Sequence, residues 1–295
     1  MQPRNAAESS EPSSAAAPAR AFIPVYVISL ADAELRRRNM RARLEAVGVP
    51  FTFVDALYGR AAPVPDQIDG ARVERTMFKT EVGLACTVSH RLLHRVIAEG
   101  EAETALILED DAIIPNDFVE VVEHALTLDF DVFKLEGVNA SKRRVGIGRV
   151  GRYEVIVTNR PSVGAAAYLL RRDAARRICS LPALDQACDY VFQDPRLRLR
   201  VLEMNPFCVQ QDPAGVSQIA HLPDERSVHE DQWAFDRMLG STRRKLLFGR
   251  IHGPMMLLRL ELQRLRPVRT GLAIFRWSIF FAVVIALAVG VWLVF

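Results

Sequence analysis

Short apolar runs alternate with longer amphipathic segments along much of the chain. Residues 23–30, 51–54 and 104–108 form runs rich in β-branched and aromatic side chains, which are typical of buried strands. Residues 32–47 and 80–96 carry apolar side chains every three or four positions, as amphipathic helices do. This succession of strands and helices predicts an α/β fold, and we expect a mixed, mostly parallel sheet with short connections.

The ends of the two predicted helices carry capping signals. Asp32 and Thr80 stand where an N-cap belongs, and Gly48 follows the last apolar residue of the first helix. The pattern continues beyond residue 108. It predicts a helix at about 116–126, a strand at 132–135, a polar hairpin at 141–161, a strand at 165–170 and a helix at about 173–179.

The last 19 residues, 277–295, contain no charged side chain. A helix of that length rises about 28 Å, close to the roughly 30 Å hydrocarbon core of a bilayer. We therefore predict a transmembrane helix at residues 272–295 rather than a buried core helix. The basic residues before it favour a cytoplasmic location for the N-terminal body, so we expect a single-pass anchor in the inner, cytoplasmic membrane.

The region before this anchor, residues 226–270, mixes arginines with leucines and methionines. We interpret it as a basic amphipathic juxtamembrane region. Such a helix can lie on an anionic lipid surface or pack against the protein, and the sequence does not decide between these alternatives.

Composition indicates a folded protein with an uneven charge distribution. The chain has 295 residues, 38 Lys plus Arg, 35 Asp plus Glu and a net charge of +3, which excludes a disordered chain or a nucleic-acid-binding polycation. Residues 241–295 hold nine of the basic residues and one acidic residue. Residues 1–20 are rich in Ala, Ser and Pro without a signal-peptide core, so we expect a disordered leader before a folded domain at 21–225.

The four cysteines show neither a CxxC pair nor the spacing of a zinc site. They are Cys86, Cys179, Cys188 and Cys208. With no secretion signal, we expect reduced, ordinary buried thiols.

Three consecutive carboxylates follow the apolar run at 104–108: Glu109, Asp110 and Asp111. Their mutual repulsion must be offset. Ligands bind at the carboxyl ends of strands in α/β sheets, and hard divalent cations prefer oxygen ligands. Spacing alone leaves two alternatives open, a metal site and a solvated acidic turn.

Other motifs carry less information. His90 and His94 lie one helical turn apart, but no HExxH motif is present, so we favour a substrate-binding or structural role for His90 over a zinc site. Residues 146–151 match GxGxxG without a following helix, which indicates a flexible turn and not a dinucleotide site. The chain has no phosphate loop of the GKS/T type and no GxSxG elbow, which argues against phosphate-loop ATPases and serine hydrolases.

Four segments stand in an order and at separations typical of one enzyme family. They are 27–30 with Arg36 and Arg37, 53–56, 80–90 and 106–111. Together they resemble family 25 glycosyltransferases, the lipooligosaccharide galactosyltransferases and their collagen-modifying relatives. The similarity covers about residues 22–220. Its strongest element is the Glu-Val-Gly and Ser-His pair at 81–90 followed by Leu-Glu-Asp-Asp at 108–111.

The resemblance implies a GT-A-like fold, a UDP-sugar donor such as UDP-galactose, and a divalent cation, Mn²⁺ above all. It identifies Glu109, Asp110 and Asp111 as the DxD-type metal motif. It also implies that Asp189 is the general base of an inverting displacement and that His90 assists catalysis. The residues implied to bind substrate are Ser29, Arg36, Asp55, Glu81, Ser89, Gln210 and Ser217.

The acceptor is expected to be a cell-envelope glycan or glycolipid such as lipooligosaccharide, because neither end of the chain carries the targeting signals expected of the collagen-directed relatives. Two alternatives remain. One is a membrane-anchored binding or scaffold protein of the same fold without activity. The other is a metal-dependent phosphodiesterase or nuclease using the same acidic cluster, against which the acidic body and the lack of a His/Asp ligand array count.

Overall fold

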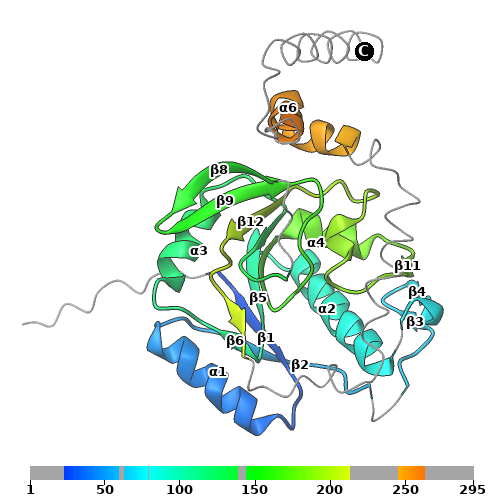
Figure 1. Ribbon diagram of the computed structural model, residues 1–295. Helices are drawn as coiled ribbons and strands as arrows, with labels where there is room; N and C mark the ends of the chain where they lie inside the picture. The colour runs from blue at the N-terminus through cyan, green and yellow to red at the C-terminus, as the bar shows by residue number, and fades with distance from the viewer. Residues whose placement is uncertain (1–22, 60–62, 79, 139–143, 213–244, 263–295) are drawn as a thin grey trace, which may run out of the picture.

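In the computed structural model the described residues are 23–59, 63–78, 80–138, 144–212 and 245–262. An eight-stranded sheet with the order β2-β1-β5-β10-β7-β12-β9-β8 forms its centre (Figure 1). Its strands are β1 (Val25–Ser29), β2 (Thr52–Asp55), β5 (Thr104–Glu109), β7 (Val132–Lys134), β8 (Arg144–Val150), β9 (Tyr153–Thr158), β10 (Ala167–Arg171) and β12 (Val201–Asn205). The helices are α1 (Glu34–Ala46), α2 (Glu81–Glu99), α3 (Phe118–Leu126), α4 (Arg172–Cys179) and α6 (Pro254–Leu262), with residues 245–252 also helical.

Two smaller sheets and two 3₁₀ turns complete the described structure. One sheet contains β3 (Gln67–Ile68), β4 (Ala71–Val73) and β11 (Ala183–Leu184), and the other contains β6 (Ala112–Ile113) and β13 (Gln210–Gln211). The 3₁₀ turns are η1 (Arg75–Met77) and η2 (Val191–Gln193).

The prediction of an α/β fold with a mixed sheet is confirmed, but the expectation of a mostly parallel sheet is wrong. Among the described strands of the large sheet, three pairings are parallel and four are antiparallel. The β1-β2-β5 part is parallel, as the strand-helix-strand pattern requires. β10 lies between β5 and β7 and is antiparallel to both. The pattern of apolar residues within one strand does not determine which strands it pairs with.

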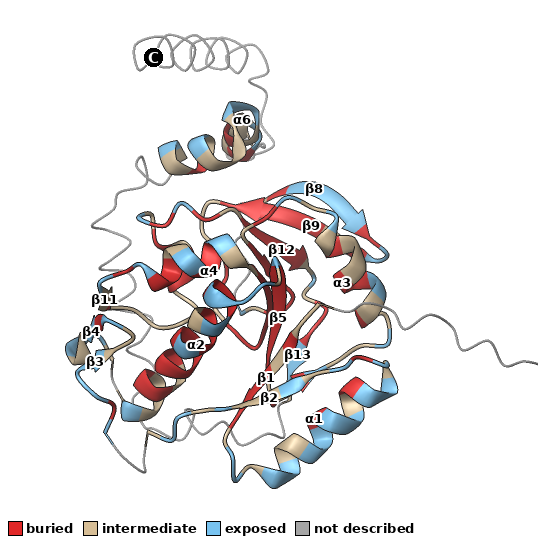
Figure 2. Cartoon of the chain, turned by 180° about the vertical axis from the view of Figure 1, so that it is seen from behind, coloured by how far each residue is buried: buried red, intermediate tan, exposed pale blue. Residues whose placement is uncertain are grey.

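Helices cover both faces of the sheet, and each face has its own apolar core. Residues of α1, α3 and α6 pack with one face, and residues of α2 and α4 pack with the other. Seen from behind, in Figure 2, the central strands are mostly buried while α1 exposes its outer side. The sheet is therefore the middle layer of three, and only its edges and strand ends can form an open site.

The helix-capping predictions have different outcomes. Thr80 caps α2, since its Oγ1 accepts a hydrogen bond from the Gly83 amide at 3.0 Å. Gly48 follows α1 with a φ of 68°, as predicted. Asp32 is not the cap of α1, however; the N-cap is Ala33, which makes no side-chain hydrogen bond.

The hairpin predicted at 141–161 is confirmed as β8 and β9. We expected the glycine-rich motif at 146–151 to be a flexible turn, and this expectation is wrong for most of the motif. Gly146 and Gly148 lie within β8, where the pairing with β9 shifts register between them, and Gly151 occupies the turn with a φ of 51°. Strand glycines mark an irregularity here, and the motif leads directly into β9.

The described part of the region at 226–270 packs against the protein. Phe248, Leu257 and Leu260 are buried in the same core as α1 and α3. For these residues the packed alternative is favoured over a helix lying on lipid.

Several predictions fall on residues outside the described part: the leader at 1–20, most of the region at 226–270, the transmembrane helix at 272–295 and Ser217. None of the helices within the described residues has the length and apolar content needed to cross a bilayer.

Candidate active site

The carboxyl ends of three neighbouring parallel strands form one edge of the large sheet. β1 ends at Ser29, β2 at Asp55 and β5 at Glu109. Ser29 is in register with Asp55, and Ile28 with Glu109. Ligands of open α/β sheets bind at this edge. Residues predicted from separate sequence segments are thus brought together by the topology.

The acidic triad, Glu109, Asp110 and Asp111, is divided between the two faces of the sheet. Side chains alternate along β5, so Leu106 and Leu108 pack on the α1 side and Ala105 and Ile107 on the α2 side. Glu109 continues the alternation toward α2 and contacts His90, whereas Asp110 turns toward α1 and contacts Arg36. Within the described residues, the ligand atoms of the three carboxylates therefore do not all lie within 4.8 Å of one another.

Asp110 is held by two donors on its own side of the sheet. Its Oδ2 accepts a hydrogen bond from Ser29 Oγ at 2.7 Å, and its Oδ1 accepts one from Arg36 Nη1 at 2.8 Å. Only 8% of its side chain is exposed. Because both oxygens already have protein partners, the geometry gives Asp110 the role of joining β1, α1 and the end of β5. Ser29 and Arg36, both predicted from sequence, are its partners.

Glu109 begins a chain of buried hydrogen bonds on the other side. His90 Nε2 lies 3.1 Å from Glu109 Oε1, and Tyr168 Oη lies 2.8 Å from His90 Nδ1 and 2.7 Å from His94 Nε2. Burial favours the neutral imidazole, but hydrogen bonds to Cys86 and Glu109 outweigh it and raise the pKa of His90 to about 10.

The protonation states of these residues then follow, because each hydrogen bond needs one donor and one acceptor. A protonated His90 donates to both Glu109 and the Tyr168 oxygen, and Tyr168 donates to His94 Nε2. Burial, together with the charges of His90 and Arg91, lowers the pKa of His94 well below its usual value, so His94 is neutral. Its protonated Nδ1 is then buried without a partner. Glu109 thereby accepts a hydrogen bond from a cationic neighbour.

Asp111 differs from both of its neighbours. Its Oδ1 is buried and has no hydrogen-bond partner. Burial, followed by repulsion from Glu109, raises the pKa of its carboxyl from 3.8 to about 7. A buried carboxylate oxygen without a donor is costly, and a bound cation is one group that would satisfy it.

The backbone around Asp111 is fixed by a distant segment. The Asp111 carbonyl accepts from the Asp212 amide at 2.8 Å, and β13 pairs with β6 immediately after the triad. Arg43 of α1 donates to the Ala112 carbonyl at 3.0 Å and pairs with Asp212 at 2.5 Å. Gln210, predicted to bind substrate, is exposed on β13 opposite Ile113. This brings the 210–212 segment to the triad.

A model of one protein family matches residues 22–183, more than half of the chain, and its description is glycosyltransferase family 25 (LPS biosynthesis protein). The chain belongs to glycosyltransferase family 25. The matched segment contains β1, α2, β5 and β10, and it ends before Asp189 and Gln210. No curated protein matches the chain at the significance required.

The family 25 segment also contributes to a buried polar cluster that the sequence did not reveal: Lys134, Glu136, Ser162, Gly164, Asp189 and Glu203. Lys134 is fully buried and donates to the Ser162 carbonyl at 2.5 Å and the Gly164 carbonyl at 2.7 Å. Asp189 Oδ2 accepts from the Gly164 amide at 2.9 Å. The sequence signal for this cluster is Lys134, a charged residue within the otherwise apolar stretch Val132–Leu135.

Gly164 is required at the centre of this cluster. Its φ is 106°, and a Cβ there would lie 2.6 Å from Glu136 Oε2. Glu136 is buried, and its charge also interacts with Glu109 and Asp189. The backbone of Gly164 therefore lies close to Glu136 and also holds Asp189, the predicted base. Glu136 is a carboxylate of this region that was not predicted from the sequence.

Ser89 and Glu81, both predicted to bind substrate, contact residues near the N-terminal half of α2. Ser89 Oγ donates to the Ala85 carbonyl at 2.8 Å and accepts from the Leu57 amide at 2.9 Å, which fixes the loop after β2 to α2. The carboxylate of Glu81 pairs with Arg75 at 2.6 Å, at the N-terminal end of α2.

Asp55 forms an ion pair with Arg37. Arg37 also donates to the Ser29 carbonyl at 3.0 Å, so this pair supports the β1 end of the site. Arg37 was noted in the family motif, but its role appears only in the structure.

Glu136 makes the stability of the fold depend on pH. Burial raises the pKa of its carboxyl from 4.5 to about 7. Between these values the folded state holds a proton that the unfolded state has lost, so this group's contribution to the free energy of unfolding falls as the pH rises, by roughly 3 kcal/mol. Glu136→Gln should remove this dependence, which urea unfolding at about pH 5 and about pH 7 measures.

The control for this experiment is Glu120→Gln, which changes an exposed carboxylate on α3. It should keep the wild-type pH dependence. An equal dependence in wild type and Glu136→Gln would show that Glu136 is ionised in the fold at all these pH values.

Proposed function

We propose that the chain transfers a hexose, galactose or a similar sugar, from a UDP-sugar to a cell-envelope glycan or glycolipid such as lipooligosaccharide, with inversion at the anomeric carbon. Its family, described as glycosyltransferase family 25 (LPS biosynthesis protein), supports the reaction class. The observation that carries the proposal is Asp111, a half-buried carboxylate whose buried Oδ1 has no hydrogen-bond partner, beside Glu109 at the carboxyl edge of the sheet.

The residues at this edge fit a divalent cation. Asp111 and Glu109 would hold it, while Asp110, whose two oxygens accept from Ser29 and Arg36, would stabilise their backbone. A hard cation is coordinated by carboxylate oxygens, and its charge would offset the desolvation cost that raises the pKa of Asp111. When bound, Mn²⁺ would supply positive charge that stabilises the departing UDP.

The remaining groups would bind and orient the reactants. Arg36 places a guanidinium beside the triad, where an anionic donor would gain from its charge. Asp189, held by the Gly164 amide, would accept the proton of the acceptor hydroxyl as general base. His90 would orient Glu109 through its hydrogen bond.

Membrane placement belongs to the same proposal. The transmembrane helix at 272–295 would hold the enzyme at the inner membrane with its catalytic domain in the cytoplasm. Support comes from the uncharged sequence at 277–295 and the basic residues before it. Anchoring would raise the effective concentration of the enzyme near a lipid-linked acceptor.

A donor panel tests the proposal. Purified full-length protein in detergent is incubated with a set of nucleotide sugars and lipooligosaccharide, with or without Mn²⁺, and the released nucleotide is measured. We expect turnover of a UDP-hexose and a loss of at least about 100-fold on chelation, the scale of removing one electrostatic stabiliser of a transition state.

Each other result has a clear meaning. Turnover that is unchanged by chelation would refute the cation. Binding of the envelope glycan with no release from any donor would favour the inactive scaffold.

A further inference from the structure

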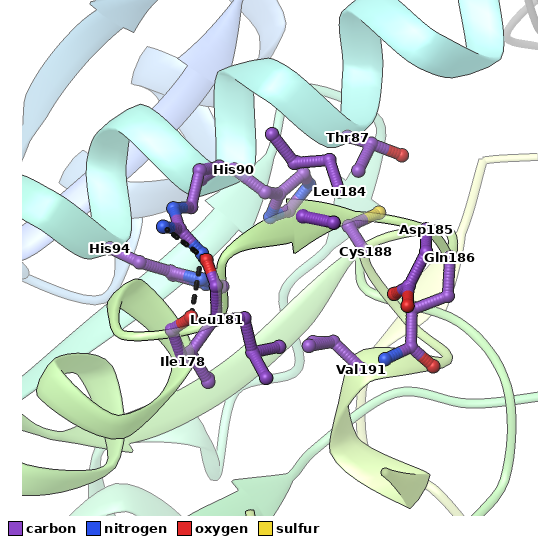
Figure 3. Close-up of a pocket in the computed structure, with 12 residues that line it drawn as sticks. Thr87, His90, His94, Ile178, Leu181, Leu184, Asp185, Gln186, Cys188 and Val191 are labelled. Carbon is purple, nitrogen blue, oxygen red and sulfur yellow. Dashed lines mark hydrogen bonds between the residues drawn. The ribbon is translucent and has the colours of Figure 1, made fainter. Parts of the chain in front are cut away.

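Two cysteines and a histidine from distant parts of the sequence meet beside α2. The ligand atoms of Cys86, His90 and Cys188 all lie within 4.8 Å of one another. Cys86 and His90 stand one turn apart on α2, so both project from the same face of the helix. Cys188 comes from the segment after β11 and lines a pocket together with His90 (Figure 3).

We propose that this Cys–His–Cys cluster binds a transition-metal ion with affinity for sulfur, Zn²⁺ being the best match. Thiolate sulfur and imidazole nitrogen are the ligands of zinc sites, and three protein ligands leave a fourth position for water or another donor. The all-oxygen site proposed for Mn²⁺ has the opposite preference, so the two sites would bind different ions.

The surroundings of His90 are those of a metal ligand. The ring is fully buried, and its nitrogens contact Tyr168 Oη at 2.8 Å and Glu109 at 3.1 Å. The ion would displace the proton from one ring nitrogen of His90, and the other nitrogen would keep the hydrogen-bonding partner that fixes the ring, as is usual for histidine ligands. Both cysteines are free and only partly buried, and Cys188 lines the pocket.

Metal binding would tie α2 to the segment that carries the predicted base. Cys188 is adjacent in sequence to Asp189, whose carboxylate accepts from the Gly164 amide. The ion would therefore act as a positioning element for Asp189, a consequence that rests on the proposed function, whereas metal binding itself does not.

Titration with Co²⁺ tests the site. Full-length protein stripped of metal by a chelator under reducing conditions should give thiolate-to-cobalt charge-transfer absorption and the intense visible bands of a tetrahedral ion, saturating at one ion per chain. Zn²⁺ should displace the Co²⁺ and remove the bands. Cys86→Ser and Cys188→Ser should lower the affinity at least about 10-fold, and Cys179→Ser, a buried cysteine of α4 outside the cluster, should not.

A second measurement uses the wild-type chain, in case a variant fails to fold. Zn²⁺ should slow alkylation of Cys86 and Cys188 and leave the rate at Cys179 unchanged. Weak octahedral Co²⁺ bands, alkylation rates insensitive to Zn²⁺, or a Cys86–Cys188 disulfide in the protein as isolated would each overturn the proposal. Because these readouts do not involve sugar transfer, their failure is distinguishable from a failure of the donor panel.

Discussion

Asp111→Asn should lower kcat/KM for sugar transfer by about 100-fold or more, while the protein remains folded. The substitution keeps the shape of the side chain and removes the negative charge that would hold the cation. One electrostatic contribution to the transition state is worth about 2.7–4 kcal/mol. Initial rates at varied UDP-sugar and Mn²⁺ concentrations measure the effect, and the dependence on Mn²⁺ should weaken together with the rate.

Stability should separate this effect from simple misfolding. The raised pKa of Asp111, about 7, means that its ionised form opposes folding in the absence of a cation. Above that pH, the metal-free asparagine variant should therefore be at least as stable as the metal-free wild type. Asp173→Asn is the matched control, since Asp173 forms an exposed ion pair with Arg176, and its activity should equal that of the wild type. Full activity in Asp111→Asn would refute the role of this carboxylate.

Local sequence patterns were sufficient for the elements that surround this site. The apolar runs and the helical spacing predicted β1, α2 and β5 close to their observed positions. They also predicted that the acidic residues lie at the end of this strand, where Glu109 is the last residue of β5. These features depend on neighbours in sequence, whose side chains report their own periodicity and capping.

The two faces of the sheet separate members of the triad that are consecutive in sequence. Glu109 and Asp110 were treated as one cluster because they are consecutive, yet consecutive residues at the end of a strand face opposite sides. Applying the alternation of β5 one residue further would have separated them. Their partners, His90 and Arg36, belong to helices on opposite faces, and only the topology places them there.

The cysteines and the buried polar cluster depend on contacts between segments that are distant in sequence. Cys86 and His90 could have been paired from their spacing on one helix, but Cys188 joins them only because the segment after β11 passes beside α2. Likewise, no short-range pattern connects Lys134 with Gly164 or Asp189. Non-local pairs of this kind require the strand order, which the sequence pattern did not predict.

Lys134→Met should lower the free energy of unfolding by about 3–5 kcal/mol, the usual cost of removing one partner from a buried ion cluster. Lys134 is fully buried and neutralises carboxylates at Glu203, Asp189 and Glu136. Methionine fills a similar volume, so the loss comes from uncompensated charge and from the Ser162 and Gly164 carbonyls that lose their donor. Urea unfolding at pH values above the pKa of Glu136 measures the change.

The pH dependence of this loss identifies its cause. Burial raises the pKa values of Glu136 and Glu203, so at acidic pH these groups are protonated and Lys134 has less charge to neutralise. The destabilisation should therefore be smaller there than at neutral pH. Lys245→Met, which removes the partly exposed pair with Glu261, should cost at most about 1 kcal/mol. If Lys134→Met costs no more than this control, the buried lysine does not hold the polar cluster together, and Asp189 would have to be positioned by its hydrogen bond to Gly164 alone.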